Sequence, residues 1–289
     1  MVSNQSGSLF VVATPIGNLS DMSPRAIEVL NHVAVIAAED TRHTGRLLEQ
    51  FDCRTPQLSL HEHNEASRVA RLLERLQAGD DIALVSDAGT PLISDPGYRL
   101  VRAARKAGLT VLAVPGPSSI TAALSVAGLP TDRFCFEGFL PARVSARRRQ
   151  LEGLVNAAGT LVFFEAGRRL GDTLSDMAAV FGGSREAAIA RELTKRFETT
   201  HLDTLDQLIQ WQAADANQAR GEFVVMVAPA AIKTDAAEDG QTTLDVNQLL
   251  KLLRQEGLSA KAAARVAAAL SGQTVNALYG RATEALASK

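Results

Sequence analysis

The order of apolar and polar positions predicts short strands that alternate with helices. Apolar runs of four to six residues cover positions 9–13, 33–38, 82–85 and 110–114, the length and character of strands buried on both faces. Between them, apolar residues recur at helical spacing, most clearly over residues 65–77. This alternation predicts an open parallel α/β sheet with its ligand site beyond the carboxyl ends of the strands.

The second half of the chain has a different pattern. Residues 133–139 and 161–164 are aromatic and β-branched, 187–191 form a short apolar run, and 223–227 alternate after a glycine. We therefore predict a second, smaller α/β domain with a mixed sheet. The domain boundaries that follow are 1–118 for the N-terminal α/β domain, 119–229 for the C-terminal α/β domain, 230–244 for a polar linker, and 245–289 for a helical tail.

The tail shows three helical patterns, over 245–255, 259–270 and 274–287. Ser259 and Thr274 are placed to cap the second and third helices, and the short connections resemble a helix-turn-helix. Six basic against three acidic residues leave the tail at 6 − 3 = +3. Two interpretations stay open, contact with nucleic acid or a packing appendage that clamps a dimer, because charge alone establishes only non-specific attraction.

Composition is that of an ordinary globular chain, with 46% hydrophobic and 21% charged residues. Only two cysteines occur, the start of the chain has no basic and apolar leader, and no apolar run reaches the roughly 18 residues of a membrane span. We expect a cytoplasmic protein with no membrane association. The net charge of −2 gives no global sign of nucleic-acid binding, although 30 − 6 = 24 of the basic residues are arginines. Arginine suits bidentate contact with phosphate, but a GC-rich genome also enriches it.

Three loops rich in Gly, Pro, Ser and Asp follow predicted strands, at residues 14–18, 86–97 and 115–119. Such loops can present backbone N–H groups to a polar ligand, or they can be tight structural turns. No G-x-G-x-x-G follows the first strand and no P-loop occurs. The sequence therefore lacks the motifs that would indicate a dinucleotide-dependent oxidoreductase or an NTPase. The sequence His61-Glu62-His63 lacks a third ligand at a familiar spacing, and Asp87 and Asp95 have no other carboxylates nearby in sequence, so we expect no metal site.

Taken together, several segments resemble a known family. They are TPIGNL, AAEDTRHT, LVSDAGTPLISDPG, VPGPSSITAALSVAGLP, FEGFLP, FFEAGRR and ARELTKRFE, in this order along the chain. The set resembles the tetrapyrrole-methylase superfold of S-adenosylmethionine-dependent enzymes. Within it, residues 8 to about 229, and more loosely the tail, resemble the ribosomal RNA small-subunit methyltransferase I family. That resemblance implies two α/β domains around a cofactor cleft, and 2′-O-methylation of a cytidine in the decoding region of small-subunit ribosomal RNA.

The resemblance also implies which residues bind S-adenosyl-L-methionine. They are Pro15, Ile16, Gly17, Asp87, Ala88, Gly89, Thr90, Ile93, Ser118, Ser119, Ala166, Leu193 and Gly221. Thr90 stands where relatives that act on tetrapyrroles have an aspartate, and Asp87 lies three residues earlier. The hydroxyls of Ser118 and Ser119 could instead cap the helix that begins near Ile120.

A ribose hydroxyl becomes a good nucleophile only when a base accepts its proton. Glu39, Asp40 and Glu165 are the candidates, because each lies near a predicted strand end facing the cleft. The alternative is that these carboxylates pair with nearby arginines, Asp40 with Arg42 and Glu165 with Arg168.

Arginines are the candidates for contact with RNA phosphates. They are Arg42, Arg143, Arg147, Arg148, Arg149, Arg168, Arg169 and Arg191. The cluster at 143–149 could equally be a solvated helix face.

We expect the target cytidine to be splayed out of its stack. We also expect the RNA to be held within the assembled small subunit, and the chain to form a homodimer, as the superfold usually does. Alternatives are a methyltransferase of the same fold acting on a tetrapyrrole or a protein side chain, and a non-catalytic RNA-binding assembly factor. The arginine cluster and the tail favour RNA, because a small substrate needs neither.

Overall fold

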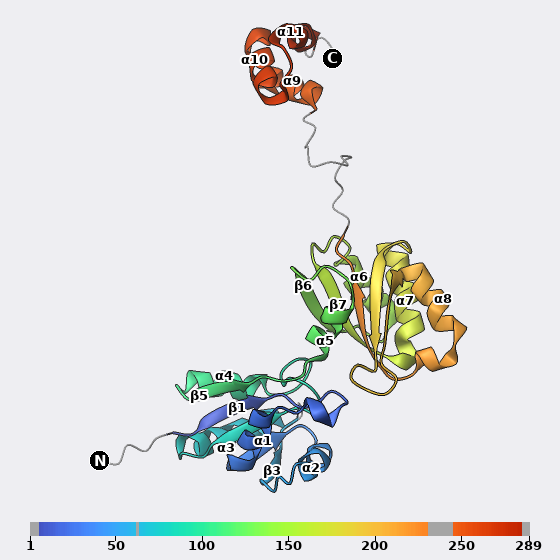
Figure 1. Cartoon of the computed structure of the whole chain (residues 1–289). Coiled ribbons are helices and arrows are strands. Elements are labelled where there is room, and N and C mark those ends of the chain that lie inside the picture. Colours follow the sequence, from blue (N-terminus) through green and yellow to red (C-terminus); the bar gives the residue numbers. More distant parts are fainter. Residues whose placement is uncertain (1–5, 62–63, 231–244, 285–289) are drawn as a thin grey trace. The chain divides into compact units, whose positions relative to one another are not determined.

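The computed structural model describes residues 6–61, 64–230 and 245–284. The chain forms two compact units, Met1–Ala230 and Ala231–Lys289. Within these described residues, the larger unit contains two five-stranded sheets and the smaller one three helices (Figure 1). The predicted division at 118–119 falls between the two sheets, but both belong to one unit, so that boundary stays a prediction. The predicted linker, 230–244, lies outside the described residues apart from Ala230.

The first sheet is parallel throughout, with strand order β3-β2-β4-β1-β5. Its strands are β1 (Ser8–Val12), β2 (Val35–Ala38), β3 (Gln57–Ser59), β4 (Ile82–Val85) and β5 (Thr110–Val114). The predicted parallel sheet is therefore confirmed. Strand β3 was not predicted, because three half-buried residues leave no apolar run to detect.

Helices cover both faces of this sheet. They are α1 (Pro24–His32), α2 (Thr41–Glu49), α3 (Glu65–Gln77) and α4 (Tyr98–Lys106). Along β2, Ile36 packs in one buried cluster with Leu30 of α1, while Ala37 packs in another with Leu72 of α3. Both sides of each central strand are thus apolar, which explains the unbroken hydrophobic runs in the sequence.

The second sheet is mixed, as predicted, with strand order β6-β7-β10-β8-β9. Its strands are β6 (Phe134–Phe139), β7 (Thr160–Ala166), β8 (Glu186–Arg191), β9 (Thr199–Thr204) and β10 (Glu222–Val227). Strand β6 is parallel to β7, whereas β10 runs antiparallel to β7 and β8, and β9 antiparallel to β8.

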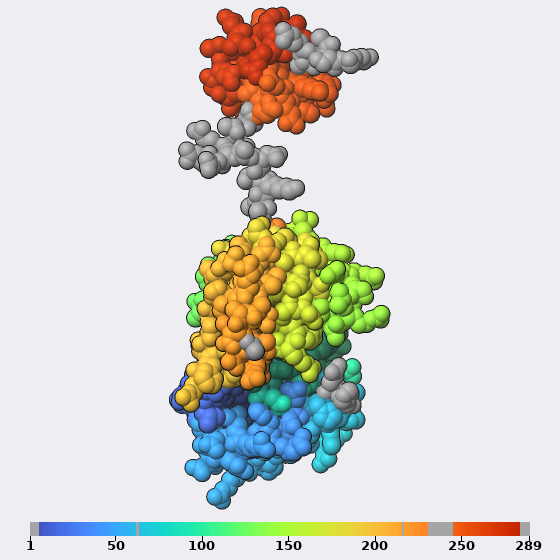
Figure 2. Space-filling view, turned by 90° about the vertical axis from the view of Figure 1, so that its right-hand side faces the viewer, coloured from blue at the N-terminus to red at the C-terminus, as the bar shows by residue number. Residues whose placement is uncertain are grey.

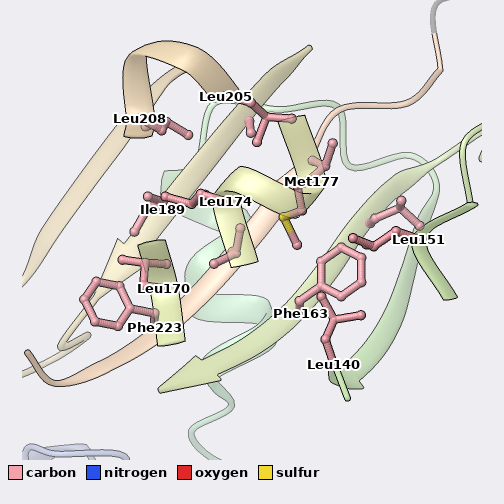
Figure 3. Close-up of a cluster of buried hydrophobic side chains, with 14 residues drawn as sticks. Leu140, Leu151, Phe163, Leu170, Leu174, Met177, Ile189, Leu205, Leu208 and Phe223 are labelled. Atoms are coloured by element: carbon pink, nitrogen blue, oxygen red, sulfur yellow. The ribbon is translucent and has the colours of Figure 1, made fainter. Parts of the chain in front are cut away.

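One face of this sheet packs against three helices, α6 (Val144–Glu152), α7 (Gly167–Phe181) and α8 (Leu205–Ala214). Phe163 of β7 and Leu174 of α7 are fully buried in that core (Figure 3). The opposite face packs against α5 (Ser119–Val126) and against Ile16 from the first half of the unit. The loop after β1 therefore lies against the second sheet.

A bulge interrupts the edge strand β6. The pairing with β7 shifts register between Phe136 and Gly138, and Gly138 has φ +69°, a left-handed conformation that favours glycine. A bulge re-aims the side chains that follow it. Here it is followed directly by Phe139, whose side chain is exposed.

The smaller unit contains α9 (Val246–Gln255), α10 (Ala260–Ser271) and α11 (Val275–Glu284). The predicted caps are confirmed, because Ser259 accepts a hydrogen bond from the Ala262 amide at 3.2 Å and Thr274 one from the Ala277 amide at 3.4 Å. The predicted last residues of the third helix, 285–287, lie outside the described residues. In the part of the chain that the structure describes, no helix is long and apolar enough to cross a bilayer.

Candidate active site

A cleft of about 460 Å³ lies in the larger unit, a size typical of small-molecule sites. The loops that follow β1, β2, β4 and β5 line one side, and residues of β6, β7, β8 and β10 line the other. Figure 2 shows the two halves of the unit against each other, the first coloured blue to teal and the second green to orange. The parallel strands therefore deliver their loops to one place, as the topology requires.

Most of the residues expected to bind the cofactor line this cleft. They are Ile16, Asp87, Ala88, Gly89, Thr90, Ile93, Ser118, Ser119, Ala166, Leu193 and Gly221. The two remaining residues, Pro15 and Gly17, do not line the cleft. Pro15 is buried, and Gly17 lies next to Lys195, where a Cβ on the glycine would come within 2.5 Å of the lysine Cγ. Lys195 itself lines the cleft, as does Phe139, and neither was predicted. Both come from segments far along the chain, so no local spacing marked them.

Hydrogen bonds tie the first-half loops together. The Thr14 amide donates to the Gly89 carbonyl at 2.9 Å, the Gly89 amide donates back at 3.1 Å, and the Thr90 hydroxyl donates to the Pro117 carbonyl at 3.0 Å. Gly89 has φ +80°, and a Cβ there would lie 3.2 Å from Cγ2 of Ile16. The positive φ favours glycine at this turn, and a Cβ would press against Ile16.

Part of the loop after β4 holds non-glycine residues in left-handed backbone conformations. Leu92 has φ 75° and Ser94 has φ 66°. Each such residue costs about 1–3 kcal/mol, and such strain clusters at ligand sites. Ile93, between them, is 38% exposed and lines the cleft.

Three carboxylates, Glu39, Asp87 and Asp95, line one flank of the cleft. Burial raises the pKa of Glu39, and the charges of Asp95 and Asp87 raise it further. Burial also raises the pKa of Asp95, with Asp87 adding to the effect. A carboxylate with a raised pKa is a stronger proton acceptor. Glu39 is thus the predicted base whose position and electrostatics fit the role.

Asp40 does not line the cleft, which corrects the expectation that it faces the site. Its Oδ1 accepts the Arg42 amide at 2.8 Å at the start of α2, and its Oδ2 lies 3.1 Å from Nη2 of Arg42. The hydrogen bonds from Arg42 lower the pKa of Asp40 to about 2. The structure therefore supports the alternative, a helix cap paired with Arg42.

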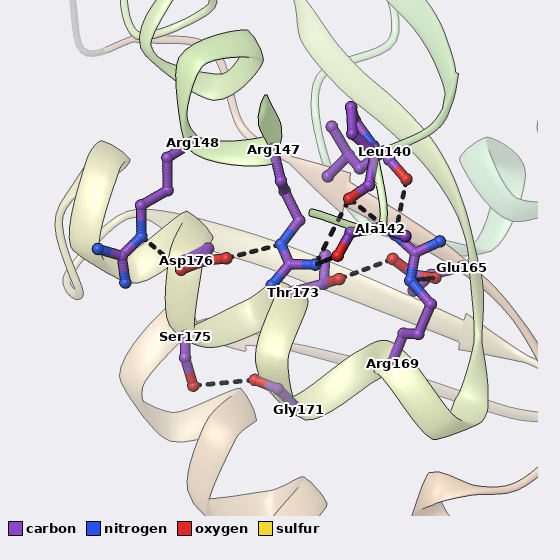
Figure 4. A network of polar contacts seen from close by, with 11 residues as sticks. Leu140, Ala142, Arg147, Arg148, Glu165, Arg169, Gly171, Thr173, Ser175 and Asp176 are labelled. Carbon is purple, nitrogen blue, oxygen red and sulfur yellow. Dashed lines mark hydrogen bonds and ion pairs between the residues drawn. The ribbon is translucent and has the colours of Figure 1, made fainter. Parts of the chain in front are cut away.

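Glu165 lines the cleft, but its side chain is almost fully buried. Oε2 accepts the Thr173 hydroxyl at 2.6 Å, Oε1 accepts the Ala166 amide at 2.9 Å, and Nε of Arg169 lies 3.3 Å from Oε1 (Figure 4). The alternative pairing of Glu165 with Arg168 is wrong: Glu165 lies near the end of strand β7, and the first turn of α7 directs Arg169 towards it while Arg168 is exposed. Both carboxylate oxygens are occupied, so Glu165 organises the site more than it accepts a proton.

The arginines proposed to contact RNA divide into buried and exposed side chains. Arg147 is 3% exposed and its Nε lies 2.6 Å from Oδ2 of Asp176, so the expectation that it contacts RNA is wrong (Figure 4). Arg148 pairs with Oδ1 of the same aspartate at 2.6 Å yet stays half exposed. Burial raises the pKa of Asp176, but the hydrogen bonds from both arginines outweigh it and the net pKa is lowered. This part of the cluster is structural.

Two further arginines have backbone partners. Nη2 of Arg169 donates to the Leu140 carbonyl at 2.6 Å, and Nε of Arg191 donates to the Arg220 carbonyl at 2.8 Å. The side chains that stay exposed are Arg42, Arg143, Arg148, Arg149 and Arg168. Arg42 and Arg148 are already paired with Asp40 and Asp176. Among the described residues, Arg143, Arg149 and Arg168 are exposed and form no ion pair, so they are available to a polyanion.

Among the described residues, no group of three or more His, Cys, Asp or Glu side chains could hold a metal ion. Of the sequence His61-Glu62-His63, only His61 is described.

Comparison with known proteins places this geometry in context. Residues 8–209 match the family model described as Tetrapyrrole (Corrin/Porphyrin) Methylases, and residues 241–286 match the RsmI C-terminal HTH domain. The chain is 51% identical over 280 residues to "Ribosomal RNA small subunit methyltransferase I" of Pseudomonas aeruginosa, covering 96% of this chain and 97% of that one. It is 48% identical over 281 residues to the protein of the same name from Escherichia coli O157:H7, covering 97% and 96%.

Solved structures share the fold of the larger unit. Uroporphyrin-III-C-methyltransferase from Thermus thermophilus superposes with a TM-score of 0.53 at 21% identity, over 78% of this chain and 95% of that one. The methyltransferase CobJ gives a TM-score of 0.58 at 19% identity, again over 78% and 95%. At these identities the likeness concerns the fold alone.

Proposed function

Because the chain belongs to the ribosomal RNA small subunit methyltransferase I family, we propose that it methylates the ribose 2′-oxygen of a cytidine in the decoding region of small-subunit ribosomal RNA. Family membership makes the chain a methyltransferase of ribosomal RNA that uses S-adenosyl-L-methionine. The choice of acceptor atom, nucleotide and region is our proposal. The observation that carries it is the assembled cleft, in which the loops of four parallel strands face a second sheet.

The residues of the cleft fit S-adenosyl-L-methionine. Ile16, Ile93 and Leu193 provide apolar walls, Ser118 and Ser119 provide hydroxyls, and the glycine turns expose backbone groups. A cavity of about 460 Å³ suits a ligand of that size. When bound, the cofactor supplies an electrophilic methyl group on a positively charged sulfur. The acidic flank complements that charge.

We propose that Glu39 accepts or orients the proton of the ribose hydroxyl. It lines the cleft, and its pKa is raised whereas that of the adjacent Asp40 is lowered, so Glu39 is the stronger proton acceptor of the two. Glu165 instead holds the start of α7 through Thr173 and Arg169. When the site holds the hydroxyl in line with the methyl group, the reactants have already lost their translational and rotational entropy before the reaction. This effect lowers the activation barrier by about 7–11 kcal/mol in ideal cases.

The exposed arginines are our candidates for contacts with the RNA backbone, because phosphate contacts position a protein on RNA without reading its sequence. Arg143 and Arg149 on or next to α6, and Arg168 at the start of α7, are exposed. We propose that they hold the RNA within the assembled small subunit, in the cytoplasm.

We also propose a homodimer. The edge strand β5 exposes Thr110, Leu112 and Ala113, although strands of a parallel sheet are normally covered on both faces. Leu112 is 39% exposed. Light scattering that gives a monomer of about 31 kDa in solution contradicts this proposal.

Mass-spectrometric mapping of ribosomal RNA from cells with and without the protein tests substrate, atom and position together. We expect one ribose methyl group on one cytidine to disappear, and to return when the gene is restored but not when a Gly89→Trp variant is supplied. The matching reaction in vitro uses small subunits that lack the methyl group and tritiated S-adenosylmethionine. Label on a tetrapyrrole or a protein instead of RNA favours the alternative substrates. Absence of saturable cofactor binding in calorimetry favours the non-catalytic assembly factor.

A further inference from the structure

An aromatic side chain stands exposed at the cleft although most large apolar residues of the unit are buried. Phe139 lines the cleft and is 58% exposed. The β6 bulge at Gly138 sets its direction. Isolated exposed apolar residues are common on protein surfaces, but one that lines a concave site with polar groups around it is a candidate for ligand contact.

Phe139 belongs to a row of three rings. Its centroid lies 5.5 Å from that of Phe164 at an interplanar angle of 61°, and Phe164 lies 4.7 Å from Phe136 at 62°. Both pairs are edge-to-face, the geometry that aromatic rings prefer. Phe164 also lines the cleft and is half-buried. The row supports Phe139 from one side and leaves much of its ring exposed.

The segment after Phe139 is anchored. The Leu140 carbonyl accepts Nη2 of Arg169 at 2.6 Å, and the Ala142 carbonyl accepts Nη1 of Arg147 at 3.4 Å (Figure 4). Arg169 and Arg147 are held in turn by Glu165 and Asp176, and Leu140 is buried. Arg169 and Arg147 thus anchor the segment that directly follows the exposed ring. A rigid ring loses little entropy when it binds a ligand.

The loop after β4 lies beside the β6 bulge at the cleft. A Cβ on Gly138 would lie 3.5 Å from Oγ of Ser94, so the β6 bulge and this loop approach each other. Next to Ser94 stands Ile93, which also lines the cleft. Phe139 from the second sheet and Ile93 from a loop of the first sheet therefore line the same cleft.

We infer that Phe139 stacks on the base of the nucleotide that is methylated; this rests on the proposed function. A nucleotide that brings its ribose into a cleft leaves its own stack, and aromatic side chains replace the lost stacking of unpaired bases. The carboxylates of Glu39, Asp87 and Asp95 would repel a phosphate at this site. The part of the nucleotide that enters is therefore its sugar and base, with the phosphates left outside.

The test compares the full chain with Phe139→Ala, Phe139→Leu and Phe139→Trp, using small subunits that lack the methyl group. We expect Phe139→Ala to lower kcat/KM for the subunit by roughly 5- to 150-fold, which corresponds to the cost of truncating an aromatic side chain that stacks on a base. Phe139→Trp restores most of the loss, whereas Phe139→Leu, which keeps apolar volume but no ring, does not. Calorimetry with S-adenosylmethionine gives the same Kd for all four proteins. Phe197→Ala is the matched control, because Phe197 is 65% exposed and does not line the cleft.

A second arm uses subunits whose target nucleotide carries no base. On this substrate, we expect kcat/KM of the wild-type chain to fall by the same factor that Phe139→Ala causes on the normal substrate. We expect kcat/KM of Phe139→Ala to be the same on both substrates.

Four results overturn the inference. The first three are equal activity of Phe139→Ala and wild type, rescue of activity by Phe139→Leu, and loss of cofactor binding in Phe139→Ala. The fourth is a lower molar mass of Phe139→Ala in light scattering, because that result assigns the ring to contact with a second copy of the chain. If the wild-type chain labels no RNA, the proposed function falls as well, so the two failures are distinguishable.

Discussion

The buried ion pair between Arg147 and Asp176 allows a stability prediction that separates structure from RNA binding. The two side chains are 3% and 4% exposed, and Nε lies 2.6 Å from Oδ2. The substitution Asp176→Ala leaves the guanidinium of Arg147 buried without its counter-charge. Breaking a buried pair in this way costs about 3–5 kcal/mol. For a unit of this size, that lowers Tm by roughly 6–20 °C.

The matched control is Arg148→Ala. Arg148 contacts the same aspartate at the same distance of 2.6 Å, but its side chain is 51% exposed, so water already screens the pair. An exposed pair contributes about 0–1 kcal/mol, and we expect a shift in Tm of no more than a few degrees. Thermal unfolding followed by circular dichroism at pH 7 measures both variants. Equal destabilisation by the two substitutions would refute the reasoning, because it would show that burial does not set the cost.

The same pair predicts the pH dependence of stability. The folded-state pKa of Asp176 is lowered by its arginine partners, so the carboxylate contributes stability above its unfolded pKa. That contribution is lost as the pH falls below the ordinary range of aspartate and through the lowered folded value. Between pH 7 and pH 3, Tm of the wild-type chain should therefore fall further than Tm of Asp176→Ala, which has no carboxylate to protonate.

Three further predictions concern the cleft and the RNA surface. Gly89→Trp removes saturable S-adenosylmethionine binding in calorimetry, because even a Cβ there lies 3.2 Å from Ile16; binding with unchanged Kd would contradict the placement of the cleft. Glu39→Gln lowers kcat by about 10²- to 10⁴-fold at unchanged cofactor Kd, and removes the rise of wild-type kcat with pH through the raised pKa of Glu39; a variant that keeps this rise excludes Glu39 as the base. Arg143→Ala and Arg149→Ala each flatten the plot of log affinity for the subunit against log salt by about 1, and an unchanged slope removes them from the RNA surface.

Local pattern in the sequence was enough for much of the fold. The apolar runs that became β4 and β5 were predicted to the residue, and so was α3, because buried strands and amphipathic helices impose periods that need no tertiary information. The caps Ser259 and Thr274 were likewise local. Strand β9 was not predicted, because its polar sequence TTHLDT lies at a sheet edge, where one face needs no apolar residues.

The positions of charged side chains were decided by tertiary structure. Arg147 and Arg148 are neighbours in sequence, but successive residues of a helix point about 100° apart. Arg147 is therefore buried against α7, whereas Arg148 reaches the same helix from a half-exposed position. Their shared partner, Asp176, is 29 residues from Arg147. No spacing could distinguish the buried arginine from the exposed one, because burial depends on which helix packs alongside.

The sequence by itself determined which loops end the strands of the first sheet, and the resemblance of those loops carried the cofactor residues. Only the tertiary structure decided which carboxylate faces the cleft and which caps a helix, since Glu39 and Asp40 are adjacent yet have opposite pKa shifts. It also brought Phe139 and Lys195 to loops from the first sheet. The physical reason is that strand and helix periods are local properties, whereas burial, charge pairing and the walls of a cleft arise from contacts between distant segments.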